Sequence, residues 1–147
     1  MKILVLHGPN LNLLGRREPH IYGSMTLADI NRKLEELART LGVEIEAFQS
    51  NHEGALVDFL HKNIDSAAGA ILNPAGLTQF GVSLHDAIKT MPFPVIEVHI
   101  SNRHAREEWR HHSIISSAAK ATVEGLGWRS YIAALEKLVQ LVGETKK

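Results

Sequence analysis

Apolar residues along the chain follow two alternating patterns. Short continuous runs, such as ILVL at residues 3–6, predict strands that are buried on both faces. Longer segments between the runs place apolar residues about 3.6 positions apart, which predicts amphipathic helices. The expected strands are residues 3–6, 43–48, 68–72, 94–100 and 120–125. The expected helices are residues 26–41, 53–65, 81–90 and 130–142.

This alternation predicts the fold class. Strands that alternate with helices form βαβ units, whose strands are parallel and whose crossovers are right-handed. Five such units within 147 residues fit an α/β, flavodoxin-like three-layer sandwich with a five-stranded parallel sheet in the order 2-1-3-4-5. No repeat, low-complexity tract or linker interrupts the pattern, so a single domain spanning residues 1–147 is expected.

The first long helix also carries signals at both ends. Thr26 is followed three residues later by Asp29, the spacing of a capping box. Gly42 stands directly after the last apolar position of the helix, where a left-handed residue commonly ends a helix.

Composition narrows the classes of function. Sixteen basic residues balance sixteen acidic ones, so bulk charge gives no reason to expect nucleic acid or a membrane surface as a partner. The absence of cysteine excludes disulfides and thiolate catalysis. No apolar run approaches the roughly 20 residues of a membrane span, and the first residues lack the pattern of a signal peptide. A cytoplasmic protein is therefore expected.

Polar residues gather in the segments that follow the expected strands. The segment after the first strand, HGPNLNLLGRREPHIYG at 7–23, is far longer than a turn requires. Residues 49–54, 73–79 and 99–110 follow later strands and are also polar. Ligands of parallel sheets bind beyond the carboxyl ends of the strands, so these segments predict a site at one edge of the sheet.

Several known chemistries are excluded by missing motifs. The chain contains no Walker loop, no G-x-G-x-x-G, no H-E-x-x-H and no G-x-S-x-G. All eight lysines lie outside the polar segments, which argues against a Schiff base. What remains is acid–base chemistry that uses neither a metal nor an organic cofactor.

The candidate groups for such chemistry are a tyrosine, an arginine, a histidine and several amides. A free phenol titrates near about 10, but a nearby guanidinium favours the phenolate, and Arg17 stands five residues before Tyr22. Asparagine amides can hold hydroxyl groups or a developing oxyanion. Packing, turn formation or solvation are ordinary alternative roles, and they remain open for Tyr22, Arg17, Asn10, His99 and Arg110.

Three blocks of residues resemble a known family. They are G-P-N-L-N-L-L-G-x-R-E-P-x-I-Y-G, then Q-S-N-H-E-G, then E-V-H-I-S-N-x-H-A-R-E-E-W-R-H-H-S. In this order, and over essentially the whole chain, they are similar to type II 3-dehydroquinate dehydratase. The resemblance implies a flavodoxin-like subunit that assembles as a dodecamer of four trimers. It also implies reversible loss of water from 3-dehydroquinate by anti elimination through an enolate, without a cofactor. Both aromatic amino acid biosynthesis (the shikimate pathway) and quinate metabolism use this reaction.

The resemblance also implies roles for single residues. Tyr22 corresponds to the base, Arg17 to the group that lowers the pKa of that base, and His99 to the acid. Asn10 corresponds to the residue that holds the water or oxygen stabilising the enolate. The substrate-binding positions correspond to Asn73, Gln79, Asp86, Ile100, Ser101 and Arg110, with Asp86 expected to act across a trimer interface.

One stretch departs from the family pattern. Where the family commonly has T-H-T-S, this chain has Thr78-Gln79-Phe80-Gly81, and His85 stands where an arginine is usual. Glutamine can form hydrogen bonds but cannot become cationic, and Phe80 adds bulk. Two other functions therefore stay open: elimination on a related cyclic hydroxy-ketone, and a small-ligand-binding module without catalysis.

Overall fold

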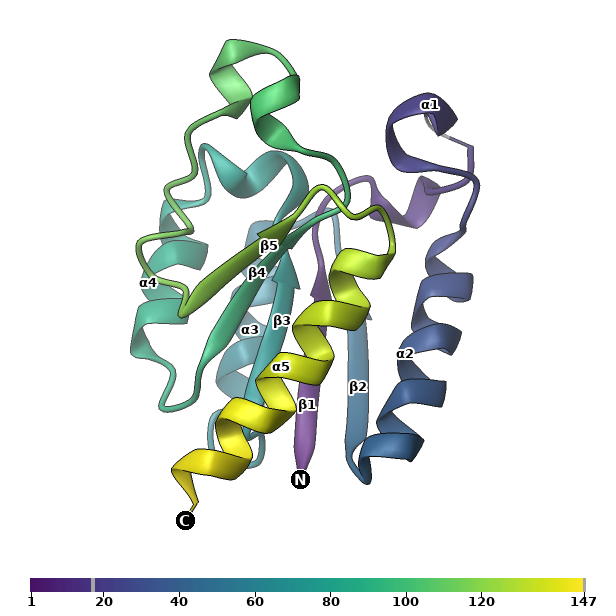
Figure 1. Cartoon of the computed structure of the whole chain (residues 1–147). Coiled ribbons are helices and arrows are strands. Elements are labelled where there is room, and N and C mark those ends of the chain that lie inside the picture. Colours follow the sequence, from purple (N-terminus) through teal and green to yellow (C-terminus); the bar gives the residue numbers. More distant parts are fainter. Residues whose placement is uncertain (17, 147) are drawn as a thin grey trace.

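The computed structural model describes residues 1–16 and 18–146, and for Tyr22 it describes the backbone alone. Five parallel strands form one sheet in the order β2-β1-β3-β4-β5, which confirms the predicted fold class (Figure 1). The strands are β1 (Lys2–His7), β2 (Glu44–Gln49), β3 (Gly69–Asn73), β4 (Val95–His99) and β5 (Ala121–Glu124). The chain reverses its direction of travel across the sheet between β1 and β3, where such folds form binding crevices.

Helices cover both faces of the sheet and make three layers. In Figure 1, α2 (Leu27–Leu41) and α5 (Arg129–Thr145) lie in front of the sheet, whereas α3 (Glu53–Lys62) and α4 (Val82–Thr90) lie behind it. The short helix α1 (Pro19–Tyr22) lies at the end of the molecule to which the strands point. Within the described residues, no helix is long and apolar enough to cross a membrane.

The sheet divides the hydrophobic core into two clusters because side chains alternate along each strand. Ile3 and Val5 belong to the cluster beneath α2 and α5, whereas Leu4 and Leu6 belong to the cluster beneath α3 and α4. All four are fully buried. Burying each aliphatic side chain contributes about 1.5–3 kcal/mol, so the central strands anchor both layers.

Three helix ends show how well local sequence signals predict the bounds of a helix. The predicted capping box is present: the Asp29 N–H donates to Oγ1 of Thr26, and the Thr26 N–H donates to the Asp29 carboxylate. Gly42 has a φ of 71° at the end of α2, as predicted. In contrast, α3 ends at Lys62 rather than at residue 65. The buried side chain of Asn63 donates to the Phe59 carbonyl at 2.9 Å, and this hydrogen bond ends the helix.

The exits of β1 and β3 approach each other closely at Gly8. The Gly8 N–H donates to the Asn73 carbonyl at 2.8 Å. A Cβ atom on Gly8 would stand 2.5 Å from the carbonyl oxygen of Pro74. This position therefore admits only glycine without a shift of the backbone.

We expect Gly8→Ala to lower the free energy of unfolding by about 1–3 kcal/mol, as overpacking in a rigid region does. Urea denaturation measures this change. The matched control is Gly54→Ala in α3, where no atom lies within 4 Å of an added Cβ. There the substitution should stabilise the protein by about 0.4–1 kcal/mol. A Gly8→Ala midpoint equal to that of the wild type would contradict the close approach.

Candidate active site

A pocket of about 260 Å³ opens at the carboxyl ends of β1, β3 and β4. It is bordered by four short 3₁₀ helices: η1 (Leu11–Leu13), η2 (Ala75–Thr78), η3 (Arg103–Ala105) and η4 (Glu108–Arg110). Three of the four polar segments that follow strands therefore line one concave site, whereas residues 49–54 do not line it. The predicted site residues that line it are Asn10, Asn73, Gln79, His99, Ile100, Ser101 and Arg110.

Three other predicted residues do not contribute a described side chain to this pocket. Arg17 lies outside the described residues, and so does the side chain of Tyr22, whose backbone ends α1. Asp86 lies on α4 and does not line the pocket of its own chain. Its carboxylate contacts Nδ1 of His85 at 2.8 Å. A role for Asp86 in a neighbouring subunit stays a prediction.

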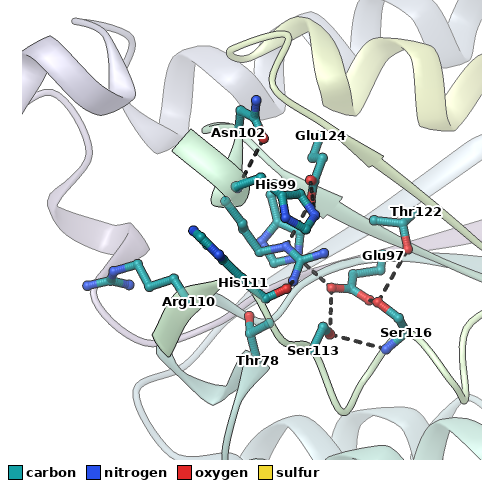
Figure 2. Close-up of polar contacts among 12 residues, drawn as sticks. Thr78, Glu97, His99, Asn102, Arg110, His111, Ser113, Ser116, Thr122 and Glu124 are labelled. Atoms are coloured by element: carbon teal, nitrogen blue, oxygen red, sulfur yellow. Dashed lines mark hydrogen bonds and ion pairs between the residues drawn. The ribbon is translucent and has the colours of Figure 1, made fainter. Parts of the chain in front are cut away.

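His99 and Glu97 form a buried pair at the end of β4. Nε2 of His99 lies 2.5 Å from Oε2 of Glu97, and neither side chain is more than 7% exposed. Two hydroxyl groups also donate to Glu97: Oγ of Ser113 at 2.9 Å and Oγ of Ser116 at 2.6 Å, as Figure 2 shows. The carboxylate therefore has partners on both of its oxygens.

These partners decide the charge of Glu97. Burial raises the pKa of a carboxyl group, but hydrogen bonds from His99, Ser116 and Ser113, together with the charge of His99, hold the pKa of Glu97 below its ordinary value. Glu97 is thus ionised at neutral pH and can only accept hydrogen bonds. Nε2 of His99 must then carry a hydrogen, which leaves Nδ1 as the ring nitrogen that can exchange a proton with a ligand.

Arginines supply positive charge around the pocket. Arg103 is almost fully buried, and its Nε donates to Glu124 at 2.8 Å, so its charge is balanced within the fold. Arg110 is paired with Glu107 at 2.8 Å, and its guanidinium stacks over the Trp109 ring, 4.1 Å from the centroid. Arg106 also lines the pocket. Guanidinium groups in this arrangement suit a ligand that carries a carboxylate.

Gln79 presents a polar atom that needs a partner. Its Nε2 donates to the carbonyl of Arg110 at 3.2 Å. Its Oε1 is buried and accepts no hydrogen bond from the described residues. A buried acceptor without a donor costs about 1–3 kcal/mol. Beside it, the rings of Phe80 and Trp109 are 73% and 56% exposed at the rim.

Several residues with polar contacts to the site were missed by the sequence analysis. Ser113 ends the third block that resembles the family and Ser116 lies beyond it, but nothing in the sequence marks either residue as a partner of Glu97. Tyr131 was expected only as an apolar residue of the last helix, yet its hydroxyl accepts from Nδ2 of Asn73 at 3.1 Å. The signal that was available is the polar tip of a tyrosine at a fully buried position.

No group of three or more histidine, cysteine, aspartate or glutamate side chains within the described residues is arranged to hold a metal ion. Among the described residues that line the pocket, His99 is the one histidine. The arrangement can therefore transfer a proton at His99, hold an anion near Arg110 and bind hydroxyl groups at the amides.

We expect Glu97→Gln to destabilise the protein in a way that depends on pH. The folded state lowers the pKa of Glu97 below the ordinary value of 4.5, so it stabilises the ionised form. This stabilisation is complete above about pH 4.5 and is lost as the pH falls through the lowered pKa. The difference in unfolding free energy between wild type and variant should thus shrink in acid. Urea titrations at several pH values measure this difference.

The control is Glu35→Gln at an exposed position, which should show no such trend. A difference for Glu97→Gln that stays constant with pH would contradict the lowered pKa of Glu97.

Comparison with known proteins places the chain in a family. The family model described as dehydroquinase class II matches residues 1–139. The 3-dehydroquinate dehydratase of Halothermothrix orenii is 49% identical over 141 residues, 96% of this chain and 95% of that relative. The same enzyme of Roseiflexus castenholzii is 52% identical over 144 residues, 98% of this chain and 92% of the relative. The crystal structure of type II dehydroquinase from Butyrivibrio crossotus has a TM-score of 0.92 at 38% identity and covers 94% of this chain and 97% of that one. The chain belongs to the class II dehydroquinase family.

Proposed function

We propose that this protein catalyses the reversible dehydration of 3-dehydroquinate to 3-dehydroshikimate. The observation that carries the proposal is the pocket that Asn10, Asn73, His99 and the cationic Arg110 line together, with His99 held from behind by Glu97. The names of the full-length relatives support the same substrate. The ligand would be a small cyclic polyol with one carboxylate and one ketone, which matches these groups in kind.

Tyr22 is proposed as the base that removes the C2 proton. None of the described pocket-lining residues is an aspartate, a glutamate or a lysine, so once His99 serves as the acid the base must come from another part of the chain. The helix α1, which Tyr22 ends, lies at the same end of the molecule as the pocket (Figure 1). Arg17, in the same segment of the sequence, would favour the phenolate form of Tyr22.

His99 is proposed as the acid. When C2 loses its proton to the phenolate, the electron pair forms an enolate, which Asn10 stabilises through a held water or a direct amide contact. The enolate then forms the C1–C2 double bond while the C1–O bond breaks, and the departing hydroxyl takes the Nδ1 proton of His99 to leave as water. The neutral ring that remains keeps its Nε2 hydrogen bond to Glu97.

The remaining polar groups are proposed to bind the substrate. Arg110, Ser101 and the backbone N–H groups of residues 100 and 101 would hold the carboxylate. Asn73 and Gln79 would bind ring hydroxyls. Asp86 would act in a neighbouring subunit of a dodecamer of four trimers, and the enzyme would work in the cytoplasm.

A second candidate function rests on Gln79 and Phe80. The unpaired Oε1 of Gln79 is a hydrogen-bond acceptor at a position where the family commonly has a histidine, and the exposed Phe80 ring enlarges the apolar rim. A related cyclic hydroxy-ketone with a different substituent at this point would undergo the same elimination. Gln79→His discriminates the two: it should lower KM for 3-dehydroquinate if that is the substrate, and it should not if the pocket is built for another ring.

We expect the purified protein to convert 3-dehydroquinate to a product that absorbs as a conjugated enone, in the presence of a chelator. Tyr22→Phe should reduce kcat by roughly 10²–10⁴-fold, because general base catalysis is worth about that much. Circular dichroism and the oligomeric state serve as the controls for folding. A folded wild type that does not turn over 3-dehydroquinate would refute the proposed reaction, and a fully active Tyr22→Phe would refute the proposed base.

We expect Gln79→Leu to raise KM for 3-dehydroquinate by about tenfold or more while kcat changes little. The variant keeps a similar volume but removes the acceptor for a substrate hydroxyl, so it removes binding that ground state and transition state share. Steady-state kinetics measure both parameters. The matched control is Phe80→Leu at the exposed rim, which should change KM by less than about threefold. Equal KM values for Gln79→Leu and wild type would show that no hydroxyl binds there.

A further inference from the structure

A line of hydrogen-bonded side chains runs from α2 through the core to the pocket. Oδ1 of Asn31 on α2 lies 2.8 Å from Nε2 of His7 at the end of β1. Nδ1 of His7 lies 3.0 Å from the hydroxyl of Tyr131 on α5, which in turn accepts from Nδ2 of Asn73 at 3.1 Å. Asn73 lines the pocket, whereas His7 and Tyr131 do not.

We propose that His7 and Tyr131 are positioning residues that set the orientation of the Asn73 amide toward the substrate. This inference rests on the proposed function, in which Asn73 binds a ring hydroxyl. It assigns a role in the reaction to two side chains that never touch the ligand.

Burial restricts the hydrogen-bonding role of each side chain in this line. His7 and Tyr131 are fully buried, and Asn73 is 4% exposed. The Tyr131 ring belongs to the apolar cluster between the sheet and the α2–α5 layer, where a phenylalanine ring would fill nearly the same volume without a polar group. Polar groups buried there are costly unless each finds its partner, so each atom of the line has one permitted role.

The direction of each hydrogen bond follows from its chemistry. Oδ1 of Asn31 can only accept, so Nε2 of His7 carries the hydrogen. Burial lowers the pKa of His7 to about 4, so the ring is neutral near pH 7 and Nδ1 is an acceptor. Burial also raises the pKa of Tyr131, whose O–H therefore donates to Nδ1 of His7. The Tyr131 oxygen is then free to accept from Asn73.

These hydrogen bonds fix the orientation of the Asn73 amide. Its Oδ1 accepts from the Ala75 N–H at 3.1 Å, and its Nδ2 donates to Tyr131. Exchanging the two ends of the amide would place a donor against a donor at Ala75 and an acceptor against an acceptor at Tyr131. The pocket therefore meets one fixed N–H and one fixed lone pair of Asn73.

The first test reads the tautomer of His7 without any substrate. Imidazole ¹⁵N shifts of the wild type near pH 7, with the His7 signal assigned by its loss in His7→Gln, should show a neutral ring protonated at Nε2. A ring protonated at Nδ1, or a cationic ring, would overturn the proposal because Tyr131 could then no longer donate to His7. This readout does not depend on whether 3-dehydroquinate is the substrate.

The second test is a double-mutant cycle on KM for 3-dehydroquinate. Tyr131→Phe should raise KM by about threefold to tenfold, the worth of one hydrogen bond, while kcat changes by less than about twofold. In the Asn73→Ala background, Tyr131→Phe should raise KM no further, because the group it positions is gone. Equal increments in both backgrounds would show a merely structural role and overturn the proposal.

A third variant guards against loss of folding in Tyr131→Phe. Asn31→Leu, at a half-buried position on α2, removes the acceptor that fixes the tautomer and should both mix the two His7 tautomers and raise KM. Glu35→Ala, exposed on the same helix, should change neither. An Asn31→Leu protein with the wild-type tautomer and KM would overturn the proposal. A wild type with the expected tautomer but no turnover would refute the proposed function instead.

Discussion

The hydrogen bond from the Gly8 N–H to the Asn73 carbonyl is the contact on which the site depends. It continues the β1–β3 ladder by one residue past the end of β1, at the point where the chain has reversed direction across the sheet. The loop with Asn10 and the loop with Gln79 diverge from this contact and form two walls of the pocket. β4 then brings His99 to the third wall.

Two charged groups of the site, Glu97 and Arg103, are buried and have their partners within the fold. Glu97 is fully buried, yet it stays ionised because three donors from β4 and the segment at residues 113–116 surround it. Arg103 is balanced by Glu124 from β5 in the same way. Such groups do not reorganise easily, so the positions of His99 and of the segment after it are set before a ligand arrives.

Most of the fold could be predicted from the sequence because the buried strands and amphipathic helices have strong periods, and even the cap at Thr26 was correct. The end of α3 was not, since Ile64 continues the apolar pattern while the Asn63 side chain ends the helix. The pocket residues at strand ends were predictable from topology. Ser113, Ser116 and the His7–Tyr131 contact were not, because partners distant in sequence leave no pattern in a single chain.

The unpaired oxygen of Gln79 bears on how the site tells one molecule from another. In the proposed function, a substrate hydroxyl at that point satisfies the oxygen, whereas an analogue without the hydroxyl leaves the buried acceptor unpaired. Rejection of the deoxy analogue thus follows from a penalty on the protein rather than from a steric clash, and penalties of this kind can separate two ligands of equal size by several orders of magnitude. Selectivity would therefore reside in one amide oxygen, even though the rim around it is wide and aromatic.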